Sequence, residues 1–168
     1  MTYYQEIFKE IKDLLSKHVS VNVDNLDYGT HLTIDGTEVW LESEPDELTI
    51  GYGLSHVHYD SKHDNLREGI ERLFNLLTKR KRITTYFKGD KIFKERTEIE
   101  LQKDKFEHFG TTTTWLFPFW RRTTKNIQFQ DPFLDFDKVE NGIEEIYKLI
   151  RAKRPVHNNV FASSGVDA

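Results

Sequence analysis

Cysteine is absent from the 168-residue sequence, which excludes disulfides, thiolate metal sites and cysteine nucleophiles. Long apolar runs are absent too. The longest, residues 115–120, has six residues, against the roughly 20 that a membrane-spanning helix needs. The amino terminus carries acidic residues and shows neither the basic flank nor the small-residue cleavage site of a secretory signal. We therefore expect a cytoplasmic protein with no membrane partner.

The common catalytic motifs are also missing. There is no phosphate-binding loop, no GxSxG elbow, no GxGxxG fingerprint and no HExxH pair. The mean hydropathy of −0.65 is low, but an aromatic content of 13% argues against wholesale disorder. The length fits one domain. The sequence therefore predicts a folded protein that is not an enzyme and needs no cofactor.

What is present are three amphipathic helix patterns with strand patterns between them. The helices begin near Thr2, Asn65 and Asp137, which are capping residue types, and carry hydrophobic residues at three- and four-residue spacing. Strand patterns cover 32–34, 37–42, 48–59, 82–87, 91–101, 111–120 and 126–129. Asp35-Gly36 suits a type I′ hairpin turn, and Gly89-Asp90 is a second hairpin signal.

The resulting order is α-βββ-α-ββ-ββ-α. It predicts an α+β domain over residues 1–151, with an antiparallel sheet and three helices packed mainly on one face. Residues 152–168 have no period and are expected to form a flexible tail.

Two expectations concern the strands after the second helix. Lys94, Arg96, Glu98 and Glu100 alternate along one strand and should form a solvated charged face. Residues 79–125 hold 13 basic and 6 acidic residues with interspersed aromatics, as in single-strand binders. These aromatics (Tyr86, Phe87, Trp115, Phe119 and Trp120) alternate within predicted strands, which is typical of core-facing residues. Because the whole chain carries a net charge of −4, we do not expect a nucleic-acid partner.

Charge is unevenly distributed along the chain. Residues 1–60 contain three basic residues, Lys9, Lys12 and Lys17, against twelve acidic ones. A dense acidic group surrounds Trp40 and comprises Asp35, Glu38, Glu42, Glu44, Asp46 and Glu47. Such a surface suits a basic partner protein, and an exposed tryptophan could anchor the contact. The alternative for Trp40 is cross-strand packing.

One constellation could bind a metal. On a strand, residues two apart share a face, so His56, His58 and Asp60 would project together, with His63 beyond them. Two imidazoles and a carboxylate can hold zinc or iron. The favoured alternative is that these histidines complete a half-buried strand through local hydrogen bonds, or contact a partner.

Residues 48–60, followed by a helix and the hairpin 83–91, resemble small α+β proteins encoded beside bacterial polymorphic toxins. Those proteins have a strand with the pattern G-[FY]-x-x-x-H-x-H-[FY]-[DE], which Gly51, Tyr52, His56, His58, Tyr59 and Asp60 match. The resemblance covers about residues 38–100, and residues 102–168 show none. It implies an immunity protein, or antitoxin, that neutralises a cognate bacterial toxin by direct binding.

Overall fold

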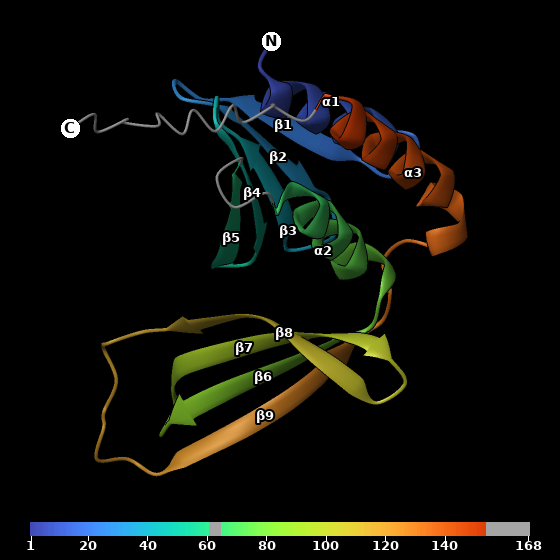
Figure 1. Ribbon diagram of the computed structural model, residues 1–168. Coiled ribbons are helices and arrows are strands. Elements are labelled where there is room, and N and C mark those ends of the chain that lie inside the picture. Colours follow the sequence, from blue (N-terminus) through green and yellow to red (C-terminus); the bar gives the residue numbers. More distant parts are fainter. Residues whose placement is uncertain (61–64, 154–168) are drawn as a thin grey trace, which may run out of the picture.

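The chain forms three helices and two antiparallel sheets in a computed structural model that describes residues 1–60 and 65–153 (Figure 1). The helices are α1 (Tyr3–Leu15), α2 (Leu66–Thr78) and α3 (Phe136–Ala152). The first sheet contains, in spatial order, β1 (Val21–Asn25), β2 (Thr30–Ile34), β3 (Val39–Ser43), β4 (Glu47–Tyr52) and β5 (Ser55–Asp60). The second sheet contains, in spatial order, β8 (Lys105–Thr113), β7 (Lys91–Gln102), β6 (Lys81–Lys88) and β9 (Thr123–Gln130).

The predicted α+β class and the order of helices and strands are confirmed, with the strands divided between two sheets. The predicted helix start at Thr2 is confirmed in detail. The Thr2 hydroxyl accepts a hydrogen bond from the Gln5 amide, and the Gln5 side chain accepts one from the Thr2 amide. The carboxyl-terminal tail predicted for 152–168 lies outside the described residues from position 154 onward.

The main core lies between the first sheet and the helices. Alternate residues of β2 to β5 point inward, among them Leu32, Leu41, Ile50 and Tyr59, and are buried against α1 and α2. Helix α3 packs on α1 and α2 through Val139, Ile143 and Ile146, and so forms an outer layer (Figure 1). All three helices therefore cover one face of the first sheet.

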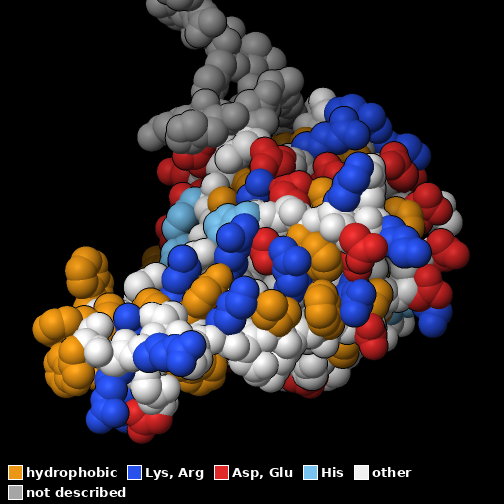
Figure 2. Space-filling view, turned by 90° about the horizontal axis from the view of Figure 1, so that it is seen from below, with side chains coloured by type: hydrophobic (Ala, Val, Ile, Leu, Met, Phe, Trp, Pro, Cys, Tyr) orange, Lys and Arg blue, Asp and Glu red, His pale blue; other side chains and the backbone are white. Residues whose placement is uncertain are grey.

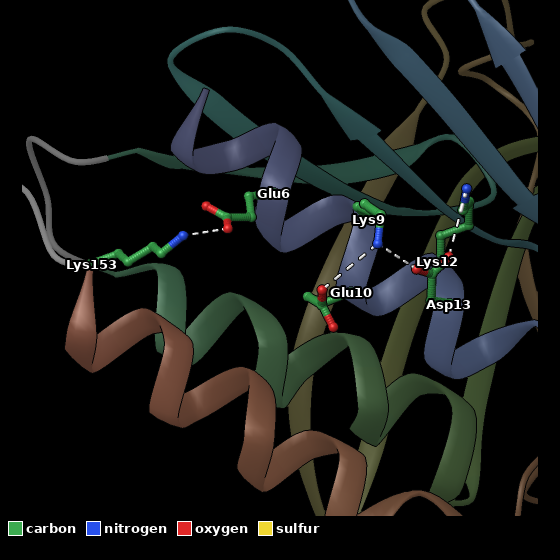
Figure 3. Close-up of polar contacts among 6 residues, drawn as sticks. All are labelled: Glu6, Lys9, Glu10, Lys12, Asp13 and Lys153. Carbon is green, nitrogen blue, oxygen red and sulfur yellow. Dashed lines mark hydrogen bonds and ion pairs between the residues drawn. The ribbon is translucent and has the colours of Figure 1, made fainter. Parts of the chain in front are cut away.

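Several ion pairs lie on the exposed surface of α1, and one of them links α1 to the end of α3. Lys9 Nζ lies 2.8 Å from Asp13 Oδ2 and 3.9 Å from Glu10 Oε1, while Lys153 at the end of α3 bonds to Glu6 (Figure 3). The hydrogen bond from Lys9 lowers the pKa of the Asp13 carboxyl. These exposed pairs make the outer side of α1 a solvated surface whose contribution to stability is small.

Two strand predictions are wrong in detail. Residues 48–59, predicted as one strand, form the hairpin of β4 and β5, because Gly53 takes a φ of +56° and turns the chain. Leu54, at this turn, is 82% exposed. At Asp35-Gly36 a hairpin does form, but only Gly36 has a positive φ (+80°), so the turn is not type I′.

The second sheet joins the first at a narrow junction. Tyr52 of β4 donates a hydrogen bond from its hydroxyl to Gln130 Oε1 at 2.7 Å, and the Ser55 and Thr112 hydroxyls lie 2.9 Å apart. Lys81, buried at the start of β6, donates to the carbonyl of Leu76 near the end of α2. The side toward the first sheet is buried through Ile83, Ile99 and Phe109 among others. The opposite side, which we call the open side, carries mostly half-buried and exposed residues, but Thr84 and Glu98 are buried there among neighbouring side chains.

Candidate functional site

The face of the first sheet that points away from the helices is the candidate site, and we call it the outer face. Registers across β2 to β5 place two cross-strand rows there, Thr33-Trp40-Gly51-His56 and His31-Glu42-Thr49-His58. Because alternation sends the neighbouring residues inward to the core, the side chains of these rows project outward. The helices contact the first sheet on its other face, and within residues 1–60 and 65–153 no helix covers the outer face.

Trp40 lies flat across the centre of the outer face. An added Cβ on Gly51, its cross-strand neighbour, would be 1.9 Å from Trp40 Cε2, so the indole occupies the space that any other residue at 51 would fill. The indole Nε1 donates to the Gly53 carbonyl at 2.9 Å. The His31 and His56 rings flank it, with centroids 5.4 and 5.8 Å away. Trp40 therefore packs across neighbouring strands, as the alternative prediction for this residue stated. These contacts hold the half-buried ring in one orientation.

The acidic residues predicted around Trp40 lie on or beside this face. Alternation along β3 places Glu42 on the Trp40 side. Glu38 and Glu44 lie directly before and after this strand, and Glu38 also lines the cleft between the two sheets. Glu47 begins β4, and Asp46 lies in the turn before it. Asp35 lies at the other end of β3, where it accepts hydrogen bonds from Ser20 and Asn22. The structure thus places Glu42 on the outer face with Trp40, and Asp35 and Asp46 in the turns at opposite ends of β3.

Two of these carboxylates have histidine partners. Glu42 Oε2 lies 3.4 Å from His31 Nδ1, and Glu47 Oε1 lies 2.8 Å from His58 Nδ1. His58 Nδ1 also lies 2.9 Å from the Thr49 hydroxyl. These contacts order the side chains of the outer face without any lysine or arginine.

The absence of basic residues extends over the whole first sheet. From residue 18 to residue 60 the sequence contains nine aspartates and glutamates and not one lysine or arginine. Every strand of the first sheet falls within this segment. Since an uncompensated run of one sign produces a field that extends beyond the surface, the outer face attracts cations and repels anions.

The predicted histidine constellation is partly assembled. His56 and His58 project from β5 on the same side, with ring centroids 5.1 Å apart in an edge-to-face arrangement. Asp60 follows on that side, opposite Glu47. Within residues 1–60 and 65–153, no group of three or more histidine and carboxylate side chains is placed to hold a metal ion. His63 lies outside the described residues.

A cleft of about 540 Å³ opens between the two sheets and has a different character. Glu38, Tyr52, Lys81, Gln130 and Phe133 are among its lining residues. Burial raises the pKa of the Tyr52 phenol to about 12 and lowers the pKa of the Lys81 ammonium. Both polar groups are engaged, Tyr52 with Gln130 and Lys81 with Leu76, so they hold the sheets and α2 together.

A second surface was missed by the sequence analysis. Strand β8 ends at Thr113, so most of the predicted strand 111–120 is instead a connection to β9. Trp115, Phe119 and Trp120, expected to face the core, are 95%, 74% and 72% exposed. Tyr86 and Phe87 are half-buried on β6. Pro118 within the aromatic run was the available signal, because proline interrupts strand pairing.

Comparison with known proteins finds no matching family model, no matching curated protein and no matching solved structure. In the described part of the chain, none of the helices combines the length and the apolar character needed to cross a membrane.

Proposed function

We propose that this protein is a non-enzymatic binding protein that captures a basic partner protein on the outer face of the first sheet. The observation that carries the proposal is that residues 18–60, which contain no lysine or arginine, build an uncovered sheet face. Acidic charge of this density steers a basic partner toward the face and rejects acidic competitors. The resemblance of residues 38–100 to immunity proteins of bacterial toxin systems makes a cognate toxin the proposed partner, in the cytoplasm.

The ordering of the outer face supports a binding role. Trp40 is held by Gly51, the Gly53 carbonyl and two histidine rings, so binding costs little side-chain entropy there. Tryptophan at the centre of an interface, surrounded by polar residues, is a typical hot spot. We therefore assign Trp40 the role of anchor and the surrounding glutamates the role of steering charges.

The experiment is a kinetic measurement against the toxic domain of a toxin encoded beside this gene, once such a neighbour is identified. We expect Glu38→Lys with Glu42→Lys to slow association at least ten-fold at low salt, with a smaller effect at high salt because ions screen the field. The matched control is Glu140→Lys with Glu144→Lys, the same charge change on exposed positions of α3. Unchanged association in the first variant, or equal slowing in both, would contradict the proposed face.

Trp40→Ala tests the anchor separately. We expect faster dissociation by about 2 kcal/mol, or about thirty-fold, with little change in association. Circular dichroism must first show that the variant keeps its sheet, since Trp40 also covers Gly51. If the wild type failed to bind or neutralise the neighbouring toxin, the proposed function would be wrong.

The rival proposal is a metal-binding protein or metal-dependent enzyme that uses His56, His58 and Asp60, with His63. Elemental analysis of untagged protein decides between the two. Stoichiometric zinc or iron that is lost in His56→Ala would favour the metal proposal, and substoichiometric metal with unchanged folding in chelator would reject it.

A further inference from the structure

The connection between β8 and β9, residues 114–122, exposes four large hydrophobic side chains at one end of the second sheet. Trp115 is 95% exposed, Leu116 91%, Phe119 74% and Trp120 72%. We call these four side chains the aromatic tip. Figure 2, which views the molecule from the side of the second sheet, shows hydrophobic side chains gathered at this end. A folded protein rarely leaves so much apolar surface in one place without a partner for it.

The connection is held in place from within. The Thr114 amide donates to the Phe93 carbonyl at 2.9 Å, and the Arg121 amide donates to the Pro118 carbonyl at 3.0 Å. Phe117 turns inward, with its ring centroid 4.9 Å from that of Phe93 on β7. One aromatic side chain therefore fixes the connection to the sheet, while the four of the aromatic tip point into solvent.

Basic residues surround the base of the aromatic tip. Arg121 and Arg122 follow it directly, and Lys88 and Lys91 flank the adjacent β6–β7 turn, together with Asp90. The two segments touch: the Gly89 amide donates to the Arg122 carbonyl at 3.4 Å, and the Arg121 side chain passes over Gly89. We call Lys88, Lys91, Arg121 and Arg122 the basic flank. Its net charge, with Asp90 included, is positive.

We propose that the aromatic tip and the basic flank dock on the surface of an anionic lipid bilayer. Tryptophan partitions to the boundary between headgroups and acyl chains, and neighbouring arginines and lysines bind lipid phosphates. The tip protrudes rather than forming a pocket, which is the shape that inserts into a soft interface. No spanning helix is needed for such binding, so the short length of the apolar run does not argue against it.

The open side of the second sheet argues against single-stranded nucleic acid as the occupant. Its aromatic rings lie under cations: Arg82 is 4.1 Å from the Phe106 centroid, Arg80 is 4.2 Å from that of Phe129, and Lys94 is 5.3 Å from that of Tyr86. Nucleic-acid platforms need ring faces that are free to stack with bases. The rings of the tip, in contrast, are attached to a protruding connection beside the cations.

The distribution of charge sets one orientation on a membrane. The first sheet carries no lysine or arginine, so an anionic surface repels it, while the basic flank is attracted. The protein would therefore approach with the β8–β9 end toward the lipid. The surface assigned to the partner protein lies on the other sheet, so the lipid proposal stands or falls independently of the proposed function.

The test uses the full chain and phosphatidylcholine vesicles with and without phosphatidylglycerol. We expect flotation of the protein with the anionic vesicles only, weakened by salt. Trp40→Phe leaves Trp115 and Trp120 as the only tryptophans, and their emission should shift to the blue on binding. Absence of flotation and of the emission shift for protein with an intact tip would overturn the proposal.

Variants separate the tip from general stickiness. Trp115→Ser with Trp120→Ser should weaken vesicle binding at least ten-fold. Arg121→Glu with Arg122→Glu should also weaken it, since each cation near an anionic surface contributes roughly five-fold. The matched control, Lys103→Glu with Lys105→Glu, makes the same charge change at the β7–β8 end of the same sheet and should bind as the wild type does.

Three other outcomes would each overturn the lipid assignment. Equal weakening by both charge variants would show a diffuse field rather than a docking site. Tip-dependent binding of an oligonucleotide without vesicle binding would assign the surface to nucleic acid. A wild type that sedimented as a dimer, with a monomeric Trp115→Ser/Trp120→Ser variant and no vesicle binding, would assign it to a second copy of the chain.

Discussion

Glu98 shows how the tertiary structure changes the chemistry of a single residue. Its position in an alternating charged run predicts a solvated side chain, yet that side chain is only 6% exposed. Arg82 Nε donates to Glu98 Oε2 at 2.8 Å, and Arg96 lies 2.9 Å from the other oxygen. The hydrogen bond from Arg82, followed by the charges of Arg82 and Arg96, lowers the pKa of the Glu98 carboxyl.

We expect Glu98→Gln to destabilise the protein by about 2 kcal/mol at pH 7, the range for hydrogen bonds to charged groups. Because the pKa is lower in the folded state than in the unfolded state, the stabilisation is present above the ordinary glutamate pKa and is lost as the pH falls through the folded-state value. Urea unfolding of both proteins from pH 7 to pH 3 should show the difference shrink in acid. Glu107→Gln, an exposed control on β8, should change stability little. A pH-independent difference would refute the ionic explanation.

At the scale of elements, α2 packs closely against β5 because Gly69 of α2 has no side chain at the point where it meets the Tyr59 ring. A Cβ on Gly69 of α2 would lie 2.6 Å from Cγ of the buried Tyr59 ring. Propensity alone favours alanine over glycine inside a helix by about 1 kcal/mol. Here the rigid ring occupies the space, so contact outweighs propensity.

We therefore expect Gly69→Ala to lower the free energy of unfolding by about 1–3 kcal/mol, the usual cost of overpacking. Gly142→Ala on α3 is the matched control. Its added methyl would meet the terminal methyls of Leu14, which can turn aside, so its effect should be distinctly smaller. Thermal unfolding of the two variants beside the wild type measures both. A stabilised Gly69→Ala variant would show that α2 and β5 can move apart freely.

At the scale of the whole molecule, the junction between the sheets has buried apolar residues, Ile83, Ile99 and Phe109 among them, and a few polar contacts. The hydrogen bond from Tyr52 to Gln130 is one of them, and it lies beside Glu38 at the cleft. Burial, and then the charge of Glu38, raises the pKa of the Tyr52 phenol to about 12. Deprotonation of this phenol would remove the donor that bridges the two sheets.

We expect Tyr52→Phe to lower the free energy of unfolding by about 1 kcal/mol at pH 7. Since the folded-state pKa is above the ordinary value of 10, the wild type loses stability from this group as the pH rises from 10 toward 12. The advantage of the wild type over the variant should fall by about 1 kcal/mol between pH 8 and pH 11 in urea unfolding. Tyr28→Phe, at an exposed tyrosine between β1 and β2, is the control and should change stability little. If the difference in unfolding free energy between the wild type and Tyr52→Phe stayed constant from pH 8 to pH 11, the raised pKa of the Tyr52 phenol would be contradicted.

Local pattern was enough to predict the helices and their buried stripes. In α1 the residues Tyr4, Ile7, Phe8 and Ile11 recur at helical spacing, and all are buried. The shared side of His56 and His58 was also predictable, because strand alternation is a property of neighbouring residues. What these residues bind was not predictable, because that depends on a partner.

The sequence by itself determined the α+β class, the helix faces and the separation of charge between residues 1–60 and the rest. Each follows from composition or from periods of two to four residues. Only the tertiary structure decided that the strands form two sheets, that Glu98 is buried and that Trp115 and Trp120 are exposed. The physical reason is that burial depends on what surrounds a side chain in three dimensions. The helices cover one side of the first sheet, Arg82 and Arg96 enclose Glu98 on the open side of the second sheet, and Trp115 and Trp120 lie in a connection beyond the strands.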